Sequence, residues 1–552
     1  MQILSFVGFT VMVGIIAYLA TRNTDESSSD GYFLGGRSLT AGVIAGSLLL
    51  TNLSTEQIVG LNGQAYTEGI LVMAWETLAA LAIVVTAIFL LPRYLKGGIT
   101  TVPQFLSKRY DKTTKTITSA LFLSGYVVVL LPIVLYSGAV AFSAMFDIPE
   151  ALGVTRMQAI WICVWGIGII GSIYAVFGGL KAVAISDSVN AVGLLIGGIM
   201  IPIFGLMYIG DGSISVGFDN LVANAPEKFN SIGDSTASVP FSTIFTGMML
   251  VQVFYWGTNQ AIIQRALAAK NLKEGQKGLI LASFIKILGP LILVIPGMIA
   301  FYIFPDLTKP DEAYPRLVAE VLPASLVGFF AAVLFGAILS SFNSALNSSV
   351  TLFGLDIYKE YFKTEATEKE VVKAGKLFGV VLAVLSMFIA PLIDKAPSGL
   401  FGYLQEVNGC YSIPILTIIV VGYLTKRVPA IAAKVAIVSG VVLYSISQFI
   451  LKPMMMASAV AEAKAAGATG KALELAAAEA YPHFLHVMAI LFVLNIVIML
   501  VIGKLRPRTE DFALEYTEQV DITPWKYVKQ VGIAVCVIVI GIYIFFSPLI
   551  PG

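Results

Sequence analysis

The stretch LTNLSTEQIVGLNGQAY, from Leu50 to Tyr66, decides the fold because it places polar side chains where an apolar helix should continue. It lies between the apolar runs AGVIAGSLLL and ILVMAWETLAALAIVVTAIFLL. A helix unwound within 50–54 would leave carbonyls free at the end of one half and amides free at the start of the other. Free carbonyls and half-helix ends at mid-membrane are how many transporters hold Na⁺. The stretch therefore predicts a broken membrane helix whose outer half begins at Glu56 and Gln57.

The composition indicates a membrane protein. Hydrophobic residues make up 57% of the chain, charged residues 12%, and the mean hydropathy is +0.86. A soluble domain carries about 25% charged residues. We therefore expect an all-α polytopic membrane protein whose main partner is the lipid bilayer. The formal net charge is +1, and no basic patch lies outside the short loops, so nucleic acid is not expected as a partner.

A membrane-spanning helix needs about 20 apolar residues, and on that basis we predict about 14 spans. The first is read as an uncleaved span rather than a signal peptide, because no Lys or Arg precedes it and no A-x-A site follows it. The predicted spans cover residues 4–20, 39–61, 70–92, 116–146, 156–177, 181–209, 241–266, 277–303, 322–353, 372–393, 398–424, 430–453, 484–503 and 527–548.

Basic residues fix the predicted orientation. Lys and Arg gather in alternate loops, at 93–115, 265–277, 359–376, 426–434 and 504–529. Such loops remain on the cytoplasmic side, so an even number of spans puts both termini outside. We expect the plasma membrane, which is the inner membrane of a bacterium. The Ala-rich segment 456–480 is predicted to form a surface helix outside the membrane.

Cysteine and histidine usage provides no enzyme or metal motif. Cys163, Cys410 and Cys536 lie in apolar runs and are expected as free, buried thiols. His483 and His486 stand three residues apart and could hold a metal, but the neighbouring proline favours a capping role at a helix end. No nucleophile–base pair is evident, so the chain is not expected to be an enzyme.

Glu76, in MAWETLAA, is an ionisable group well inside a predicted span. Burying a carboxylate there costs at least about 2.5 kcal/mol, so a partner is needed. Lys286, in SFIKILGP, is the only Lys or Arg deep within a predicted span and is the natural candidate. The pair could serve a ligand or be purely structural, and the residues alone leave both readings open.

Two further spans carry polar clusters. In VQVFYWGTNQAIIQR (251–265), Phe254, Tyr255 and Trp256 are consecutive and point around a helix rather than along one face, which favours a gate over plain core packing. In AILSSFNSALNSS (337–349), hydroxyl and amide side chains recur at helical spacing. Oxygen ligands suit a hard cation, but Ser side chains also hydrogen-bond the backbone of their own helix. The periodicity alone therefore does not distinguish a cation site from structural hydrogen bonds.

The stretches TNLSTEQIVGLNGQAY, FYWGTNQAIIQRALAAK, AILSSFNSALNSS and LDIYKEY resemble the solute:sodium symporter family, and more narrowly its sodium/galactose and sodium/glucose branch. The similarity runs from about residue 30 to residue 450. It implies a LeuT-type core of two inverted five-helix repeats, at 39–209 and 241–424. An extra helix and loop (1–38) and additional helices (425–552) would flank this core.

The resemblance also implies the sugar-binding positions Gln57, Glu76, Gln252, Lys286 and Gln405. Their carboxylate, ammonium and amide groups suit a hydroxyl-rich ligand. Two positions depart from the galactose symporter pattern, which has Asn where this chain has Gln252 and Ser where it has Ala79. These departures leave the identity of the sugar open.

The gates and the ion site are implied in the same way. The gates are Leu61, Trp75 and Phe401 outside the sugar and Tyr255 inside it, with Trp256 beside it. The Na⁺ ligands are the backbone oxygens of Leu50, Leu53 and Ala337 and the hydroxyls of Ser340 and Ser341. Asp187 matches a position linked to sodium coupling or release. A second Na⁺ site of some relatives would use Asp187, Asn343 and Ser344, and the Asn at 343 puts that site in doubt.

The resulting hypothesis is Na⁺-coupled import of a monosaccharide by alternating access, with Na⁺ as the co-transported ion. One rival is symport of another small solute, such as an inositol, a sialic acid or an amino acid. The other is a membrane sensor that binds solute without carrying it, which the short cytoplasmic loops disfavour. The oligomeric state is not predicted.

Overall fold

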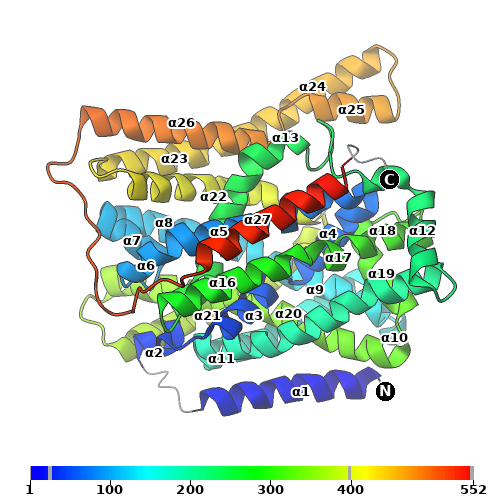
Figure 1. Cartoon of the computed structure of the whole chain (residues 1–552), viewed down its shortest axis with the longest axis horizontal. Coiled ribbons are helices and arrows are strands. Elements are labelled where there is room, and N and C mark those ends of the chain that lie inside the picture. The colour runs from blue at the N-terminus through cyan, green and yellow to red at the C-terminus, as the bar shows by residue number, and fades with distance from the viewer. Residues whose placement is uncertain (1, 23–27, 396–399, 548–552) are drawn as a thin grey trace.

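The computed structural model describes residues 2–22, 28–395 and 400–547. In these ranges the chain is helical almost throughout, and the only strand-like pairing is an isolated bridge between Leu39 and Ala269. The long helices run side by side in one bundle, with the C-terminal helices along one flank (Figure 1). The all-α prediction is therefore confirmed.

Most of the α-helices have the following bounds. In the first half of the chain they are α1 (Gln2–Thr21), α3 (Ala41–Asn52), α4 (Thr55–Glu68), α5 (Ala74–Val85), α6 (Leu91–Lys96), α7 (Val102–Arg109), α8 (Lys112–Gly125), α9 (Leu131–Met145), α11 (Arg156–Ile209), α12 (Ile214–Asn224), α14 (Met249–Gly257) and α15 (Gln260–Leu267). In the second half they are α16 (Leu272–Ile287), α17 (Gly289–Leu293), α18 (Ile295–Ile303), α19 (Ala313–Val321), α20 (Ala324–Thr351), α21 (Glu368–Ile389), α22 (Leu400–Leu424), α23 (Ala430–Ile446), α24 (Lys452–Ala465), α25 (Lys471–Glu479), α26 (Phe484–Leu505) and α27 (Val528–Phe545). Short helices join them at α2 (Ser29–Leu34), α10 (Ile148–Leu152) and α13 (Phe241–Thr243).

The predicted spans correspond to helical segments, although not all are long single helices. Among the described residues, ten helices are long and apolar enough to cross a membrane, and a bent pair formed by α16 with α17 and α18 raises the number to 11. The other three predicted spans, 4–20, 39–61 and 241–266, fall short. The described apolar part of the first is Ser5–Thr21. The other two are interrupted by non-helical residues, so neither forms one long helix.

Apolar side chains on the outer faces of the peripheral helices fit a bilayer. On α21, α26 and α27, Leu377, Ile490 and Ile533 are each more than half exposed. A soluble protein rarely exposes such continuous apolar surface. The bundle therefore has the surface of a multi-pass membrane protein.

Several helices are broken where the sequence changes character. Leu53 and Ser54 separate α3 from α4, and Thr258 and Asn259 separate α14 from α15. The Asn259 side chain accepts a hydrogen bond from the Ala261 amide at 3.0 Å and so caps α15. Within α11 the chain turns at Gly179, whose φ of +56° suits glycine. This turn separates the predicted spans 156–177 and 181–209.

The first half of the broken helix, α3, lies at the centre of the bundle and packs against α11, α16 and α20. Glycine allows two of these approaches. A Cβ placed on Gly46 would lie 2.8 Å from the Ser188 Cα of α11, and one on Gly278 of α16 would lie 2.8 Å from the Ile44 Cβ. Close backbone approach through small residues is typical of membrane helix pairs. This close packing holds α3 between α11 and α16, although the chain unwinds directly after the C-terminal end of α3.

The LDIYKEY motif extends α20 as a π-helical segment, η8 (Leu352–Phe362). Asp356 in this motif is fully buried and accepts hydrogen bonds from the hydroxyls of Thr101 at 2.9 Å and Ser119 at 3.1 Å. The Lys115 ammonium donates to the neighbouring Glu360 at 2.8 Å. The motif therefore ties the end of α20 to α7 and α8.

The two ends of the bundle differ. The first turn of α1 and the last turn of α27 lie at one end, and α2, α6 and α7, which border basic loops, lie at the other (Figure 1). The segment predicted as one surface helix at 456–480 forms two, α24 and α25, because the chain turns at Gly467 and Gly470, both with positive φ. This exposed hairpin projects from the end of the bundle that carries the termini (Figure 1).

The three cysteines are free thiols, as predicted. Cys163 is buried, whereas Cys410 and Cys536 are only half-buried, contrary to the prediction. Cys536 lies on α27 at the edge of the bundle, where an apolar side chain can face lipid and need not be buried by other helices. The prediction overestimated burial because an apolar run in a membrane protein does not distinguish a protein-facing side from a lipid-facing one.

Candidate functional site

The break between α3 and α4 provides unpaired backbone groups inside the bundle. Leu53 (φ −78°, ψ 54°) and Ser54 (φ −90°, ψ −179°) leave helical geometry, so α3 ends at Asn52 and α4 begins at Thr55. The last carbonyls of a helix have no partner within that helix. The break predicted within 50–54 is therefore confirmed, and α3 ends in carbonyls that have no partner within that helix.

The hydroxyl stripe of α20 meets this helix end. Ser341 donates to the Thr51 carbonyl at 2.7 Å, and the Ser340 hydroxyl lies 3.3 Å from the Thr51 hydroxyl. The structure thus brings Ser340 and Ser341 to the end of α3, where Leu50 and Leu53 also lie. Ala337 precedes them by one turn on α20. Carbonyl and hydroxyl oxygens form the ligand set that a hard cation prefers.

Thr51 was not predicted as part of this site. Its hydroxyl lies between α3 and α20 and contacts the hydroxyls of Ser340 and Ser344, the latter at 3.1 Å. The signal was present, because Thr51 follows Leu50 directly in the polar stretch. The resemblance implies backbone oxygens at Leu50 and Leu53, and it does not extend to the Thr51 side chain between them.

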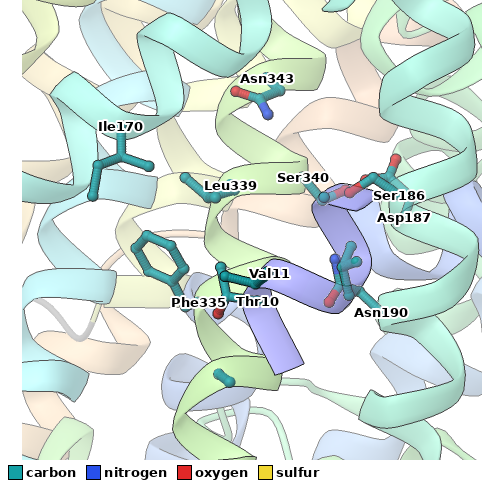
Figure 2. A pocket seen from close by; sticks show the side chains of 14 residues that line it. Thr10, Val11, Ile170, Ser186, Asp187, Asn190, Phe335, Leu339, Ser340 and Asn343 are labelled. Atoms are coloured by element: carbon teal, nitrogen blue, oxygen red, sulfur yellow. The ribbon is translucent and has the colours of Figure 1, made fainter. Parts of the chain in front are cut away.

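Asp187 lies on α11 close to the same stripe. Its carboxylate accepts a hydrogen bond from the Ser47 hydroxyl of α3 at 2.7 Å. It also lines a cavity of about 250 Å³ between α1, α11 and α20. Figure 2 shows Ser340 extending from α20 toward Ser186 and Asp187, with Asn343 one turn farther along. The Asn343 side-chain oxygen is buried and has no hydrogen-bond partner.

Arg265 occupies the place expected for a second cation. The predicted basic loop 265–277 includes this residue, but it lies on α15 and is fully buried. Its guanidinium donates to the hydroxyls of Ser344 and, at 3.2 Å, Ser47. The loop assignment was wrong because α15 turns inward after the break at Thr258, which brings its last turn beside α3 and α20.

The five residues predicted to bind sugar line one cavity, called the central cavity below. Lys286 of α16 donates to Glu76 of α5, and both side chains are at most 1% exposed. The Gln57 amide donates to the same carboxylate at 2.7 Å, and the Gln252 amide donates to the Trp75 carbonyl at 2.7 Å. The remaining lining residues include Asn52, Ala79 and Gln405.

This cavity is small. Its volume is about 30 Å³, and a single water needs roughly 10–15 Å³ of such space. The polar side chains are closed on one another, with Glu76 accepting from both Lys286 and Gln57. A sugar-sized ligand therefore requires these side chains to separate and exchange their mutual hydrogen bonds for bonds to the ligand.

Aromatic side chains close the cavity. Trp75 and Phe401 meet edge to face with ring centroids 5.1 Å apart, and both are buried. Tyr255 and Trp256 line the cavity from α14, and the Trp256 ring lies 5.6 Å from the Lys286 ammonium. Of the predicted gate residues, only Leu61 does not line this cavity. It is buried in α4.

Asn52, which was not predicted, joins the two regions. It is the last residue of α3, and its side chain accepts from Lys286 and donates to the Tyr255 hydroxyl at 3.3 Å. Its amide side chain at the end of an apolar run is a signal in the sequence, but the sequence does not reveal its partners, because they lie more than 200 residues away. The Asn52 side chain thus contacts the cavity, while the backbone on either side of it belongs to the predicted ion site.

The histidines have structural roles. His483 caps α26 by accepting from the Leu485 amide at 3.4 Å, which confirms the predicted capping role. His486 hydrogen-bonds the hydroxyls of Ser242 at 3.0 Å and Thr246 at 3.1 Å. Within the part of the chain that the structure describes, no three His, Cys, Asp or Glu side chains gather as a metal site would require.

Comparison with known proteins places the chain in a family. Residues 32–440 match the family model described as the sodium:solute symporter family. The chain is 47% identical to the uncharacterized symporter YidK of Escherichia coli (strain K12), over 98% of this chain and 90% of that protein. It is 32% identical to the sodium/glucose cotransporter of Vibrio parahaemolyticus, over 79% of this chain and 82% of that protein.

The fold also has a close counterpart among solved structures. A Na⁺-coupled sialic acid symporter in its substrate-bound outward-open state matches with a TM-score of 0.72, over 92% of this chain and 99% of that chain. The two sequences are 19% identical, so the match concerns the fold. The fold is the LeuT type expected from the sequence.

Proposed function

The chain belongs to the sodium:solute symporter family, and from this premise we propose that the solute it carries is a monosaccharide similar to galactose or glucose. Membership makes the chain a multi-pass membrane transporter rather than an enzyme. Its co-transported ion is Na⁺, and its cargo is a small solute.

One observation carries the proposal, namely a buried ion pair surrounded by amide groups. Glu76 and Lys286 face a cavity whose other polar lining consists mostly of amide side chains, those of Asn52, Gln57, Gln252 and Gln405. A sugar hydroxyl both donates and accepts hydrogen bonds. The Glu76 carboxylate accepts, the Lys286 ammonium donates, and the amide side chains do both. The aromatic ring of Trp75 adds an apolar face of the kind that packs on the C–H face of a pyranose.

The charges favour a neutral solute over an acid. An anionic solute such as a sialic acid needs a cation without a counter-charge, and Lys286 is already paired with Glu76. Among the described residues that line the cavity, these two are the only charged ones. An uncharged polyol can hydrogen-bond both partners without adding net charge to a buried site.

The end of α3 is the proposed coupling element. Na⁺ held by Leu50, Leu53, Ala337, Ser340 and Ser341 would fix the unwound chain against α20. Asn52, between these backbone ligands, bonds Lys286 in the sugar cavity. Ion binding would thereby set the position of a group that contacts the sugar. Coupling requires that Na⁺ bind most tightly to the conformation in which the sugar site is formed. An ion with equal affinity for all conformations would not change their populations.

One ion provides sufficient driving force. One Na⁺ falling through 100 mV yields about 2.3 kcal/mol, and a tenfold Na⁺ gradient adds about 1.4 kcal/mol. Together they could support roughly 500-fold accumulation of sugar. Arg265 supports this stoichiometry, because it already supplies a cation beside Ser344, where a second ion would lie.

We further propose that the inverted repeats cover 39–209 and 241–424, with both termini outside the cell. Each proposed repeat opens with a broken helix, α3–α4 in one and α14–α15 in the other. Interrupted helices at corresponding positions are typical of such repeats. The proposed orientation rests on the loops rich in Lys and Arg.

Uptake into proteoliposomes tests the proposal. The purified chain should accumulate labelled D-galactose or D-glucose under an inward Na⁺ gradient, and replacing Na⁺ with K⁺ should abolish uptake. Unlabelled myo-inositol, sialic acid and amino acids serve as competitors. Strong competition by one of these, with none by the sugars, would contradict the sugar assignment. Binding without flux would point to a sensor.

A further inference from the structure

A cavity of about 370 Å³ lies where the last turns of α26 meet the loop between α22 and α23. It is larger than the central cavity and the cavity beside Asp187. A Cβ placed on Gly503 of α26 would lie 2.9 Å from the Val428 side chain, so glycine allows the close approach that forms one wall. This basic cavity, as it is called below, is lined among others by Lys426, Arg427, Val428, Leu500, Gly503 and Asp511.

The loop that carries Lys426 and Arg427 is held in place from two sides. On one side, the buried Arg109 guanidinium of α7 donates at 2.9–3.0 Å to three of the loop's carbonyls, those of Gly422, Thr425 and Val428. On the other side runs the segment that joins α26 to α27 (Figure 1). Its Arg508 amide donates to the Arg427 carbonyl at 2.9 Å, and its Phe512 amide donates to the Lys426 carbonyl at 3.1 Å. A ligand of the basic cavity would therefore pay little to order the loop.

The surroundings of the basic cavity are positively charged. Segments 424–428 and 503–511 contain five basic and two acidic residues. Lys426 in the lining, and Lys504 and Arg506 beside it at the end of α26, are exposed and make no ion pair with any residue that the structure describes. Arg427 contacts the Asp511 carboxylate at 2.6 Å, but only through its Nε. Its two terminal nitrogens are left for an anion, and a guanidinium fits a phosphate well.

Apolar side chains border the same basic groups. Leu500 lines the basic cavity from α26 and is 46% exposed, while Leu424 at the end of α22 and Leu505 at the end of α26 are each 75% exposed. Exposed leucines at the ends of membrane helices face acyl chains. A soluble anion would use only the basic groups, whereas a phospholipid would use the basic groups with its headgroup and the leucines with its chains.

We propose that the basic cavity binds an anionic phospholipid, with its phosphate held by Lys426 and Arg427 and an acyl chain packed along Leu500 of α26. This site is separate from the proposed sugar transport and does not depend on which solute is carried. The proposed orientation puts this end of the bundle in the cytoplasm. The cytoplasmic leaflet carries anionic lipids, and basic pockets between membrane helices on that side bind their headgroups.

Lipid binding to the full-length chain, purified in detergent, tests the proposal. Native mass spectrometry with added phosphatidylglycerol should show one firmly retained lipid per chain, and zwitterionic phosphatidylcholine at the same concentration should not be retained. Lys426→Gln/Arg427→Gln should weaken binding of phosphatidylglycerol roughly tenfold or more. Asp511→Asn should strengthen it several-fold, because this change removes the carboxylate that competes for Arg427. The exposed ion pair adds little stability, so Asp511→Asn should fold normally.

Lys273→Gln/Lys359→Gln is the matched control. It removes two exposed lysines from other basic loops of the same end, and neither lines the basic cavity. It should bind phosphatidylglycerol like the wild type, and thermal unfolding without added lipid checks that every variant folds. Equal weakening in the control and in Lys426→Gln/Arg427→Gln would reduce the effect to general surface charge and overturn the site.

Inorganic phosphate distinguishes a lipid from a soluble anion. Phosphate at the concentration of the added lipid should not displace phosphatidylglycerol, because it has no acyl chain to pack on Leu500. Displacement by phosphate at that concentration would overturn the lipid assignment. Equal retention of phosphatidylcholine, or no retention of phosphatidylglycerol by the wild type, would overturn it as well.

Discussion

Lys286 donates a hydrogen bond to Asn52, the last residue of α3, and this contact joins the ion pair of the central cavity to the helix end that faces the hydroxyls of α20. The two sites are thus separated by little more than the backbone of one residue. In a protein that couples an ion to a solute, this is where the coupling free energy should be lost most readily by mutation.

Asn52→Ala is therefore expected to weaken the coupling. The substitution removes the hydrogen bond to the charged Lys286 ammonium, which is worth about 1.5–3 kcal/mol. The sugar concentration that gives half-saturation should therefore rise roughly tenfold or more. Titrating sugar at several Na⁺ concentrations should show that added Na⁺ improves sugar affinity less than in the wild type. Asn495→Ala, on the distant α26, is the matched control. An unchanged Na⁺ effect in Asn52→Ala would assign coupling elsewhere.

Glu76→Gln tests whether the buried ion pair serves the solute. It leaves Lys286 charged without its partner in a buried site, which costs about 3–5 kcal/mol of stability. It also removes an acceptor from the cavity. We expect a lower unfolding temperature and strongly reduced binding of sugar at the central site, measured by thermal unfolding and equilibrium binding.

The variant Glu76→Gln/Lys286→Met separates the two readings of this pair. Removing both charges relieves the lone buried cation, so stability should recover relative to Glu76→Gln. Sugar binding at the central site should not recover, because neither the carboxylate nor the ammonium is present. Recovery of both stability and sugar binding would make the pair purely structural.

Ser341→Ala tests the proposed sodium site. The hydroxyl contacts the Thr51 carbonyl, and loss of such a polar contact is worth about 0.5–1.5 kcal/mol. The Na⁺ concentration for half-maximal uptake should rise roughly two- to tenfold, with sugar affinity at saturating Na⁺ nearly unchanged. Ser349→Ala is the control on the same helix, since that hydroxyl bonds its own helix at Ala345. Equal Na⁺ dependence in Ser341→Ala and the wild type would remove Ser341 from the site.

Much of the architecture could be predicted from local sequence. The break after Asn52 follows from polar residues inside an apolar run, because unpaired backbone in a membrane needs polar surroundings. The ion pair between Glu76 and Lys286 follows from the cost of burying either charge alone. The residues predicted to bind sugar line one cavity, although their role in binding stays a prediction.

Other features of the structure could not be predicted, because they depend on contacts between segments that are distant in the sequence. Nothing near Arg265 indicates that it turns inward to meet Ser344, since its position after a polar break also fits a cytoplasmic loop. The hairpin of α24 and α25 was expected only as a surface helix, because its composition reveals helix propensity and not what it packs against.

Arg265 leads to the last prediction, that one Na⁺ moves with each sugar. Its guanidinium already supplies a fixed positive charge between Ser344 and Ser47, and Ser47 in turn donates to Asp187. A second Na⁺ there would face this charge and compete for the same hydroxyls. Sugar uptake should therefore depend hyperbolically on Na⁺, and parallel measurement of labelled Na⁺ and sugar entering proteoliposomes should give equal molar fluxes. A sigmoidal Na⁺ dependence with two ions entering per sugar would show that Arg265 moves aside to admit a second ion.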